Sequence, residues 1–166
     1  DQLDWATDID KNGRPVVVPG KDPTPNGNRV CPGVKGATNW MSQTFNPATG
    51  LLTLIALEQC DVFTSSSKEP EPKKSFSGGG AGPKPQDVGQ QFVRAFDPKT
   101  GKRVWEYPLT GAGEMWAGPV GTKTGVICFG DDDGHAVAVD GKTGRNLWHY
   151  NVGEMLYASP ITYAVD

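Results

Sequence analysis

The chain has 166 residues, enough for one domain with a hydrophobic core. Its formal net charge is -3 with both signs mixed, so the sequence indicates neither nucleic-acid binding nor attraction to an anionic membrane surface. The 22 glycines and 14 prolines, beside 36% hydrophobic residues, are typical of a turn-rich all-β protein.

Short strand-like runs, separated by turn-forming residues, predict the secondary structure. In chain order, the expected strands cover residues 16–18, 51–57, 91–96, 104–107, 125–129, 135–139, 146–150 and 161–165. Residues 64–90 are rich in Ser, Lys, Glu and Pro and then in Gly, without a strand signal. We therefore expect a single domain over residues 1–166 with a polar loop insertion at about 64–90.

A repeat of about 40 residues connects these elements. Residues 95–105 and 138–148 share the pattern Ala-x-Asp-x-Lys-Thr-Gly-(Lys/Arg)-x-x-Trp, with Trp105 and Trp148 43 residues apart. Trp116-Ala-Gly-Pro-Val and Tyr157-Ala-Ser-Pro-Ile form a second matched pair. Residues 45–50 and 9–13 look like weaker copies of the first turn. Such a period predicts a partial β-propeller of roughly three to four antiparallel blades, in which each tryptophan packs between blades.

Three cysteines allow more than one pairing. Cys31 follows a loop rich in Pro, Gly and Asn, Cys60 ends an apolar strand, and Cys128 lies within an apolar run. We favour a disulfide between Cys31 and Cys60, with Cys128 as a buried thiol, although spacing alone does not prove a pairing. A disulfide would indicate an oxidising compartment.

Several motifs together resemble one enzyme family. They are Cys31-Pro-Gly-Val-Lys-Gly-Ala-Thr-Asn-Trp, Phe45-Asn-Pro-Ala-Thr-Gly, Glu114-Met-Trp-Ala-Gly-Pro, Phe129-Gly-Asp-Asp-Asp-Gly-His and Tyr157-Ala-Ser-Pro-Ile-Thr-Tyr. With the tryptophan repeat, they resemble the late blades of the pyrroloquinoline-quinone (PQQ) dependent, or quinoprotein, alcohol dehydrogenases. The resemblance covers nearly the whole chain except residues 64–90 and the first few residues.

The resemblance implies a periplasmic oxidoreductase that oxidises an alcohol or a sugar. In such enzymes PQQ lies with Ca²⁺ or a lanthanide in the central channel, and electrons pass to a cytochrome c or to ubiquinone. It implies cofactor contacts for Asn39 and Trp116, and Trp40 is assigned with its neighbour Asn39. Cys31 and Cys60 match a disulfide of the family's alcohol dehydrogenases.

The family's catalytic Asp, metal ligands and quinone-stacking tryptophan belong to earlier blades, which these residues do not match. We therefore expect no catalytic and no metal-binding residue here, and a chain that forms one wall of the cofactor channel. Alone, it should be inactive and hold no cofactor. The first residues also lack the basic region and apolar core of a signal peptide, so we expect an internal portion of a longer protein.

Other interpretations remain open at this stage. Asn39 also suits a turn before a strand, and Trp116 a place in the core. For His135 and His149 a structural role is favoured, because no nucleophile or metal-ligand spacing accompanies them. The whole chain could instead belong to a non-catalytic propeller that acts as a scaffold, like the outer-membrane assembly lipoproteins. Exposed blade edges would also favour self-association.

Overall fold

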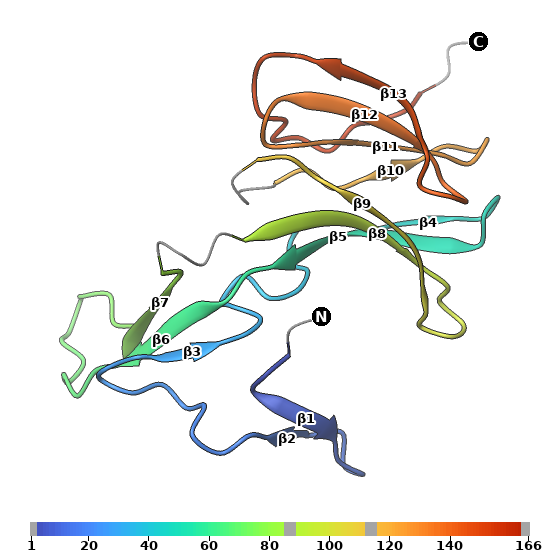
Figure 1. The fold of residues 1–166 in the computed structure, drawn as a ribbon. Helices are drawn as coiled ribbons and strands as arrows, with labels where there is room; N and C mark the ends of the chain where they lie inside the picture. The colour runs from blue at the N-terminus through green and yellow to red at the C-terminus, as the bar shows by residue number, and fades with distance from the viewer. Residues whose placement is uncertain (1–2, 85–88, 112–115, 164–166) are drawn as a thin grey trace. The chain divides into compact units, whose positions relative to one another are not determined.

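The computed structural model describes residues 3–84, 89–111 and 116–163, which contain strands and no helix (Figure 1). The strands are β1 (Ala6–Ile9), β2 (Pro15–Val17), β3 (Asn28–Val30), β4 (Thr44–Asn46), β5 (Leu51–Glu58), β6 (Asp61–Ser65), β7 (Gly79–Gly82), β8 (Gln90–Phe96), β9 (Arg103–Pro108), β10 (Val120–Gly121), β11 (Val126–Gly130), β12 (His135–Asp140) and β13 (Asn146–Asn151). All the strand pairs described within their sheets are antiparallel. The all-β prediction is confirmed.

The chain divides into two compact units, which we describe separately. The first comprises Asp1–Ala37 and Glu58–Gly89, and the second comprises Thr38–Leu57 and Gln90–Asp166. The expectation of one domain over residues 1–166 stays a prediction.

The second unit holds two four-stranded sheets with the same strand order. We call them sheet C, ordered β4-β5-β8-β9, and sheet D, ordered β10-β11-β12-β13. Buried apolar side chains of both sheets form one core cluster: Met41, Leu51, Ile55, Leu57, Val93, Ala95, Trp105, Ala117, Ile127, Phe129, Val137 and Val139. Alternation along β11 and β12 explains this, because every second residue of a strand faces the same side.

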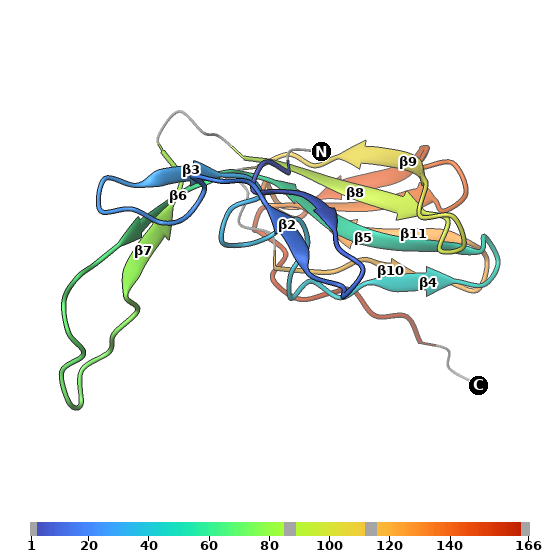
Figure 2. The same ribbon diagram turned by 90° about the horizontal axis from the view of Figure 1, so that it is seen from below.

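The first strands of the two sheets lie side by side (Figure 2). The Asn46 side-chain amide donates a hydrogen bond to the Thr122 carbonyl at 3.0 Å, and the Gly121 N–H donates to Thr44 Oγ1 at 3.2 Å. Convergence of the first strands is the arrangement expected of neighbouring propeller blades.

The repeated tryptophan turn joins sheet C to sheet D. Trp105 is 7% exposed, and its indole Nε1–H donates a hydrogen bond to the Gly141 carbonyl at 2.9 Å. A Cβ atom added at Gly144, which has φ +73°, would lie only 2.7 Å from the Trp105 ring. Glycine is therefore required there both for the turn and for the close approach of the indole.

The Asp of each repeated turn organises the turn backbone. Asp140 accepts hydrogen bonds from the Thr143 hydroxyl and N–H, both at 2.9 Å, and from the Lys142 N–H. These bonds hold the pKa of Asp140 below its usual value. Asp97 accepts equivalent bonds from Lys99 and Thr100, which lower its pKa too. The two turns are copies in structure as well as in sequence.

The supposed weaker copy at residues 45–50 is a different turn, which corrects the sequence interpretation. It joins the first two strands of sheet C, β4 and β5, whereas residues 97–101 join the last two, β8 and β9. Its counterpart in sheet D is the turn at residues 122–125, between β10 and β11. Asx-type turns share local chemistry wherever they occur, so the resemblance was local and did not mark the blade period.

The first unit carries the segment expected to be a loop. In sheet D a short turn at residues 131–134 connects the two middle strands, whereas in sheet C residues 59–89 separate the two middle strands. This excursion is not strand-free: β7 pairs with β6, and β6 pairs with β3, in a three-stranded sheet. The absence of a strand in residues 64–90 was therefore a wrong prediction, because a Gly-rich strand has no side-chain pattern to reveal it.

The predicted strand at residues 161–165 is wrong for the part of it that the structure describes. Residues 161–163 form no strand, and residues 164 and 165 lie outside the described ranges. Residues 161–163 have no strand partner among the described residues, so their apolar pattern alone does not produce a ladder.

Candidate functional site

Two tryptophans expected to contact a cofactor meet at the surface of the second unit. Trp40 precedes β4 and Trp116 precedes β10, and their ring centroids are 5.2 Å apart with an angle of 37° between the rings. Each remains 50% exposed despite this contact. Exposed aromatic faces of this kind suit the stacking of a planar aromatic ligand.

The residues that follow each tryptophan anchor it. Met41 and Ala117 point into the core, with exposures of 2% and 0%. A Cβ atom on Gly118 would collide with the backbone of Ser42, so the two segments pack backbone against backbone. Only glycine permits this approach, which makes Gly118 a positioning residue for the aromatic pair.

A third segment is tied to the same place. The Gly118 N–H donates a hydrogen bond to Ser159 Oγ at 2.8 Å. Ser42 and Ser159 are supporting residues that the sequence motifs did not predict. Their signal was nevertheless present, because Ser42, Gly118 and Ser159 each stand two residues after an aromatic residue in related segments.

Asn39 lies at the site through its position next to Trp40. It is exposed, in the loop between β3 and β4. Its side-chain amide offers both a donor and an acceptor, as the carbonyl oxygens and ring nitrogens of a heterocyclic ligand require. A ring contact joins Trp40 and Trp116. Asn39 is included in the candidate site because it is the sequence neighbour of Trp40. Glu114 and Met115 of the Trp116 motif lie outside the described residues.

The structure joins Cys31 and Cys60 by a disulfide, the pairing favoured from the sequence. Both residues are buried, at 2% and 5% exposure, within the first unit. Asp4 accepts a hydrogen bond from the Cys31 N–H at 2.8 Å and an ion pair from the Lys21 ammonium at 2.7 Å. Burial raises the pKa of Asp4, but these two interactions outweigh it and leave the pKa below its usual value.

Cys128 is less enclosed than expected. It is a free thiol on β11 of intermediate exposure, not a fully buried one. Desolvation raises its pKa, so the thiol is a poorer nucleophile than an exposed cysteine. The position gives no indication of a catalytic role.

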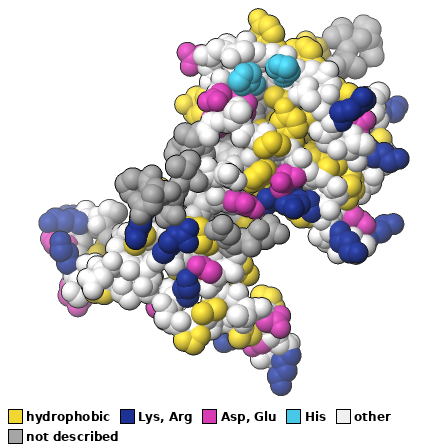
Figure 3. All heavy atoms as spheres, viewed as in Figure 1, with side chains coloured by type: hydrophobic (Ala, Val, Ile, Leu, Met, Phe, Trp, Pro, Cys, Tyr) yellow, Lys and Arg dark blue, Asp and Glu magenta, His cyan; other side chains and the backbone are white. Residues whose placement is uncertain are grey.

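His135 closes a turn, as a structural role requires. Its ring Nδ1 lies 3.1 Å from Asp131 Oδ2, and the backbone N–H of His135 donates a hydrogen bond to Asp131 Oδ1 at 2.7 Å. The Thr110 hydroxyl donates to the same carboxylate at 2.6 Å. Figure 3 shows the histidine side chains at the surface beside acidic groups. The Asp131 carboxylate thus bonds to His135 in its own turn and to Thr110, which follows β9 of sheet C.

Within the described residues, no three side chains of His, Cys, Asp or Glu lie together as a metal-binding group. The same residues include no helix of the length and apolarity needed to cross a bilayer.

Known proteins match this chain in both sequence and structure. A family model described as "Outer membrane protein assembly factor BamB" matches residues 89–164. The chain is 30% identical, over its whole length, to quinoprotein alcohol dehydrogenase PedH of Pseudomonas putida, of which it covers 29%. It is 31% identical to a lanthanide-dependent methanol dehydrogenase of Methylacidiphilum fumariolicum, over 97% of this chain and 27% of the relative.

A solved structure agrees with these matches. The quinohemoprotein alcohol dehydrogenase of Comamonas testosteroni superposes with a TM-score of 0.87 at 26% identity, over 100% of this chain and 26% of that chain. The chain therefore spans under a third of the length of the relatives described here. The fold is an all-β partial propeller with tryptophan-docking repeats, and over its whole length the chain is similar to part of the quinoprotein alcohol dehydrogenases.

Proposed function

We propose that residues 1–166 form one wall of the cofactor channel in a dehydrogenase that oxidises alcohols or sugars with PQQ. The observation that carries this proposal is the exposed Trp40–Trp116 pair at the entry to the first strands of two adjoining sheets. Its aromatic faces fit the planar ring system of PQQ, and the Asn39 amide fits the polar edge. When bound, PQQ supplies the quinone that accepts hydride from the alcohol carbon.

The role proposed for this chain is binding, without a proton-transfer step. In this proposal, the catalytic carboxylate and the ligands for Ca²⁺ or a lanthanide belong to other parts of the full-length protein. Trp40, Trp116 and Asn39 would hold and orient the cofactor, and the isolated chain would be inactive. The naming of one relative as lanthanide-dependent supports a metal in the full-length protein.

We place the full-length protein in the periplasm, with a cytochrome c or ubiquinone as electron acceptor. The buried Cys31–Cys60 disulfide supports an oxidising compartment, because cytosolic thiols are kept reduced. Self-association through exposed blade surfaces is a further proposal, for which the exposure of β13 along its whole length is the support.

The test uses the full-length protein that contains this segment, titrated with PQQ in the presence of Ca²⁺ or a lanthanide. Cofactor affinity is followed by quenching of protein fluorescence, and turnover by dye-linked alcohol oxidation. Trp40→Leu and Trp116→Leu should each weaken PQQ binding about tenfold, since one aromatic stacking contact is removed. Phe76→Leu is the control, because Phe76 is an exposed aromatic residue of the other unit, at 47% exposure.

Unchanged affinity in both tryptophan variants would contradict the proposal.

One observation favours a second candidate function, a scaffold propeller without a cofactor: the assembly-factor family model matches residues 89–164, which contain both tryptophan-docking repeats. Under that alternative the full-length protein would show no saturable PQQ binding, and the tryptophan variants would fold and behave like the parent.

A further inference from the structure

The aromatic pair belongs to a repeat with a third member. Trp40 lies four residues before the start of β4, and Trp116 lies four residues before the start of β10. Tyr157 opens the segment that matches Trp116-Ala-Gly-Pro-Val, 41 residues later. It is 65% exposed, whereas the two tryptophans are each 50% exposed. An exposed aromatic residue therefore recurs at one phase of the repeat.

Contacts between the three segments occur at one matching position. The residues two places after each aromatic are Ser42, Gly118 and Ser159. Gly118 packs against the backbone of Ser42, and its N–H donates to Ser159 Oγ at 2.8 Å. The Tyr157 segment is thus bonded to the Trp116 segment at Gly118, the same residue through which the Trp116 segment packs on the Trp40 segment.

Further contacts fix the backbone on the other side of Tyr157. A Cβ atom on Gly130 would overlap the Leu156 side chain, so Leu156 packs directly over the end of β11. The Val152 N–H donates to the Gly134 carbonyl at 2.8 Å. Tyr157 is therefore placed by neighbours at Leu156 and Ser159, while its own ring stays accessible.

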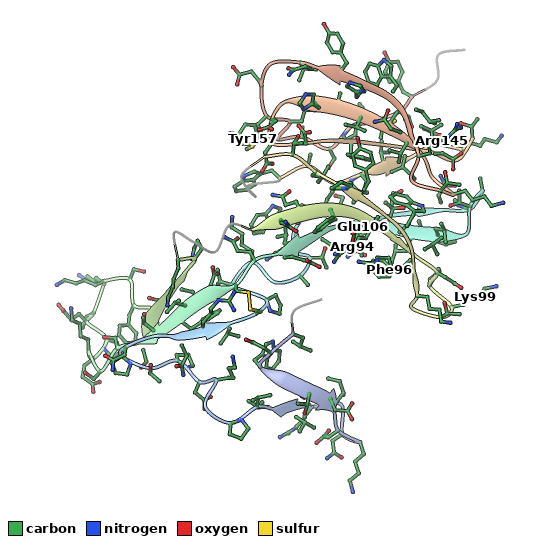
Figure 4. The ribbon with its side chains drawn as sticks, viewed as in Figure 1. Arg94, Phe96, Lys99, Glu106, Arg145 and Tyr157 are labelled. Atoms are coloured by element: carbon green, nitrogen blue, oxygen red, sulfur yellow. A yellow bond between two sulfur atoms is a disulfide. The ribbon has the colours of Figure 1, made fainter. Side chains whose placement is uncertain are left out.

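Tyr157 does not occupy the position that docks one sheet on another. That position in sheet D is Trp148, the repeat counterpart of Trp105. Figure 4 shows Tyr157 at the opposite end of sheet D from Arg145, which follows the docking turn at residues 140–144. Leu156, next to Tyr157, packs at the Gly130 end of β11, and the pairing of Val120 with Cys128 puts the start of β10 toward the same end.

We propose that Tyr157 is a third ring of the binding wall and contacts the same planar ligand as Trp40 and Trp116. The inference rests on the proposed function. A tyrosine adds a hydroxyl to an aromatic face, which suits the carboxylate-bearing edge of PQQ.

The experiment measures the dissociation constant of PQQ for the full-length protein by quenching of tryptophan fluorescence, so it does not depend on turnover. Tyr157→Leu should weaken binding about fivefold to tenfold. Tyr157→Phe, which keeps the ring, should lose less than half of that factor. Tyr163→Leu is the control, since Tyr163 is 83% exposed and stands outside the repeat position.

Trp116→Leu separates the two proposals. A loss in Trp116→Leu without a loss in Tyr157→Leu overturns this inference and leaves the proposed function standing. No loss in either variant overturns the proposed function itself. An equal loss in Tyr157→Leu and Tyr163→Leu would assign the effect to the whole segment 157–163 and would also overturn the role of Tyr157. Thermal melting of each variant confirms that the compared proteins are folded.

Discussion

Trp105 and Trp148 occupy the same place in the repeat but in different surroundings. Trp105 is 7% exposed and hydrogen-bonded to Gly141 of the next sheet. Trp148 is 54% exposed and stacks on Tyr150 of its own strand, with ring centroids 6.2 Å apart and nearly parallel. The same residue type is thus a structural link in one copy and a surface group in the other.

This difference gives a matched pair of substitutions. Trp105→Phe keeps an aromatic ring but removes the Nε1–H donor, leaving the Gly141 carbonyl without it, and should lower the free energy of unfolding by about 1 kcal/mol or more. Trp148→Phe should change it by less than about 0.5 kcal/mol, because an exposed ring is replaced by another. Urea denaturation of the 166-residue chain measures both. Equal losses in the two variants would contradict a specific role for the docking bond.

The strands best predicted from sequence are those with strong side-chain patterns. The predicted ranges 51–57, 91–96 and 135–139 match β5, β8 and β12 closely, because apolar residues alternate or run continuously there. The strands β3, β4 and β10 were missed because each has at most three residues and none forms an apolar or alternating run. They are strands through pairing with longer neighbours, which a local pattern does not contain.

The site was only partly predictable for a related reason. Trp40 and Trp116 were named from family motifs, and the structure brings their rings together. The role of Gly118 depends on the backbone of Ser42, a residue distant in sequence. Asn46 shows the same limit: its motif indicated a docking turn, yet its buried amide donates across to Thr122 of the next sheet. The roles of Gly118 and Asn46 both depend on contacts with residues distant in the sequence, which a local motif does not contain.

The excursion between β5 and β8 is stabilised in its own unit by a covalent link. Cys31 follows β3, and Cys60 lies just before β6, which pairs with β3. The bond joins residues 29 positions apart, so it should stabilise the unit by about 3.5 kcal/mol through the unfolded state.

The double variant Cys31→Ser with Cys60→Ser should therefore unfold at lower urea concentration. Cys128→Ser is the control, because Cys128 is free and lies in the other unit. Reductant should shift the midpoint of the parent protein and leave that of the double variant in place. A midpoint insensitive to reductant in the parent would contradict a stabilising role for the disulfide.

For the chain as a whole, sheet D presents a surface that resembles an unfilled docking face. Strand β13 is exposed at every residue, with Leu147, Trp148 and Tyr150 at 45%, 54% and 60% exposure. In sheet C the corresponding Trp105 is covered by the next sheet. Burial of apolar surface of this kind is favourable, so one 166-residue chain offers a second copy a ready contact.

We therefore predict that the purified 166-residue chain self-associates as its concentration rises. Static light scattering should give a mean mass that increases with concentration, and Trp148→Lys should suppress the increase by placing a charge in the contact. Phe76→Lys is the control, because it changes an exposed aromatic residue to the same charge in the other unit. A constant monomer mass for the parent, or equal suppression by both substitutions, would contradict association through sheet D. Suppression by Trp148→Lys alone would assign the contact to the surface that, in sheet C, docks on the next blade.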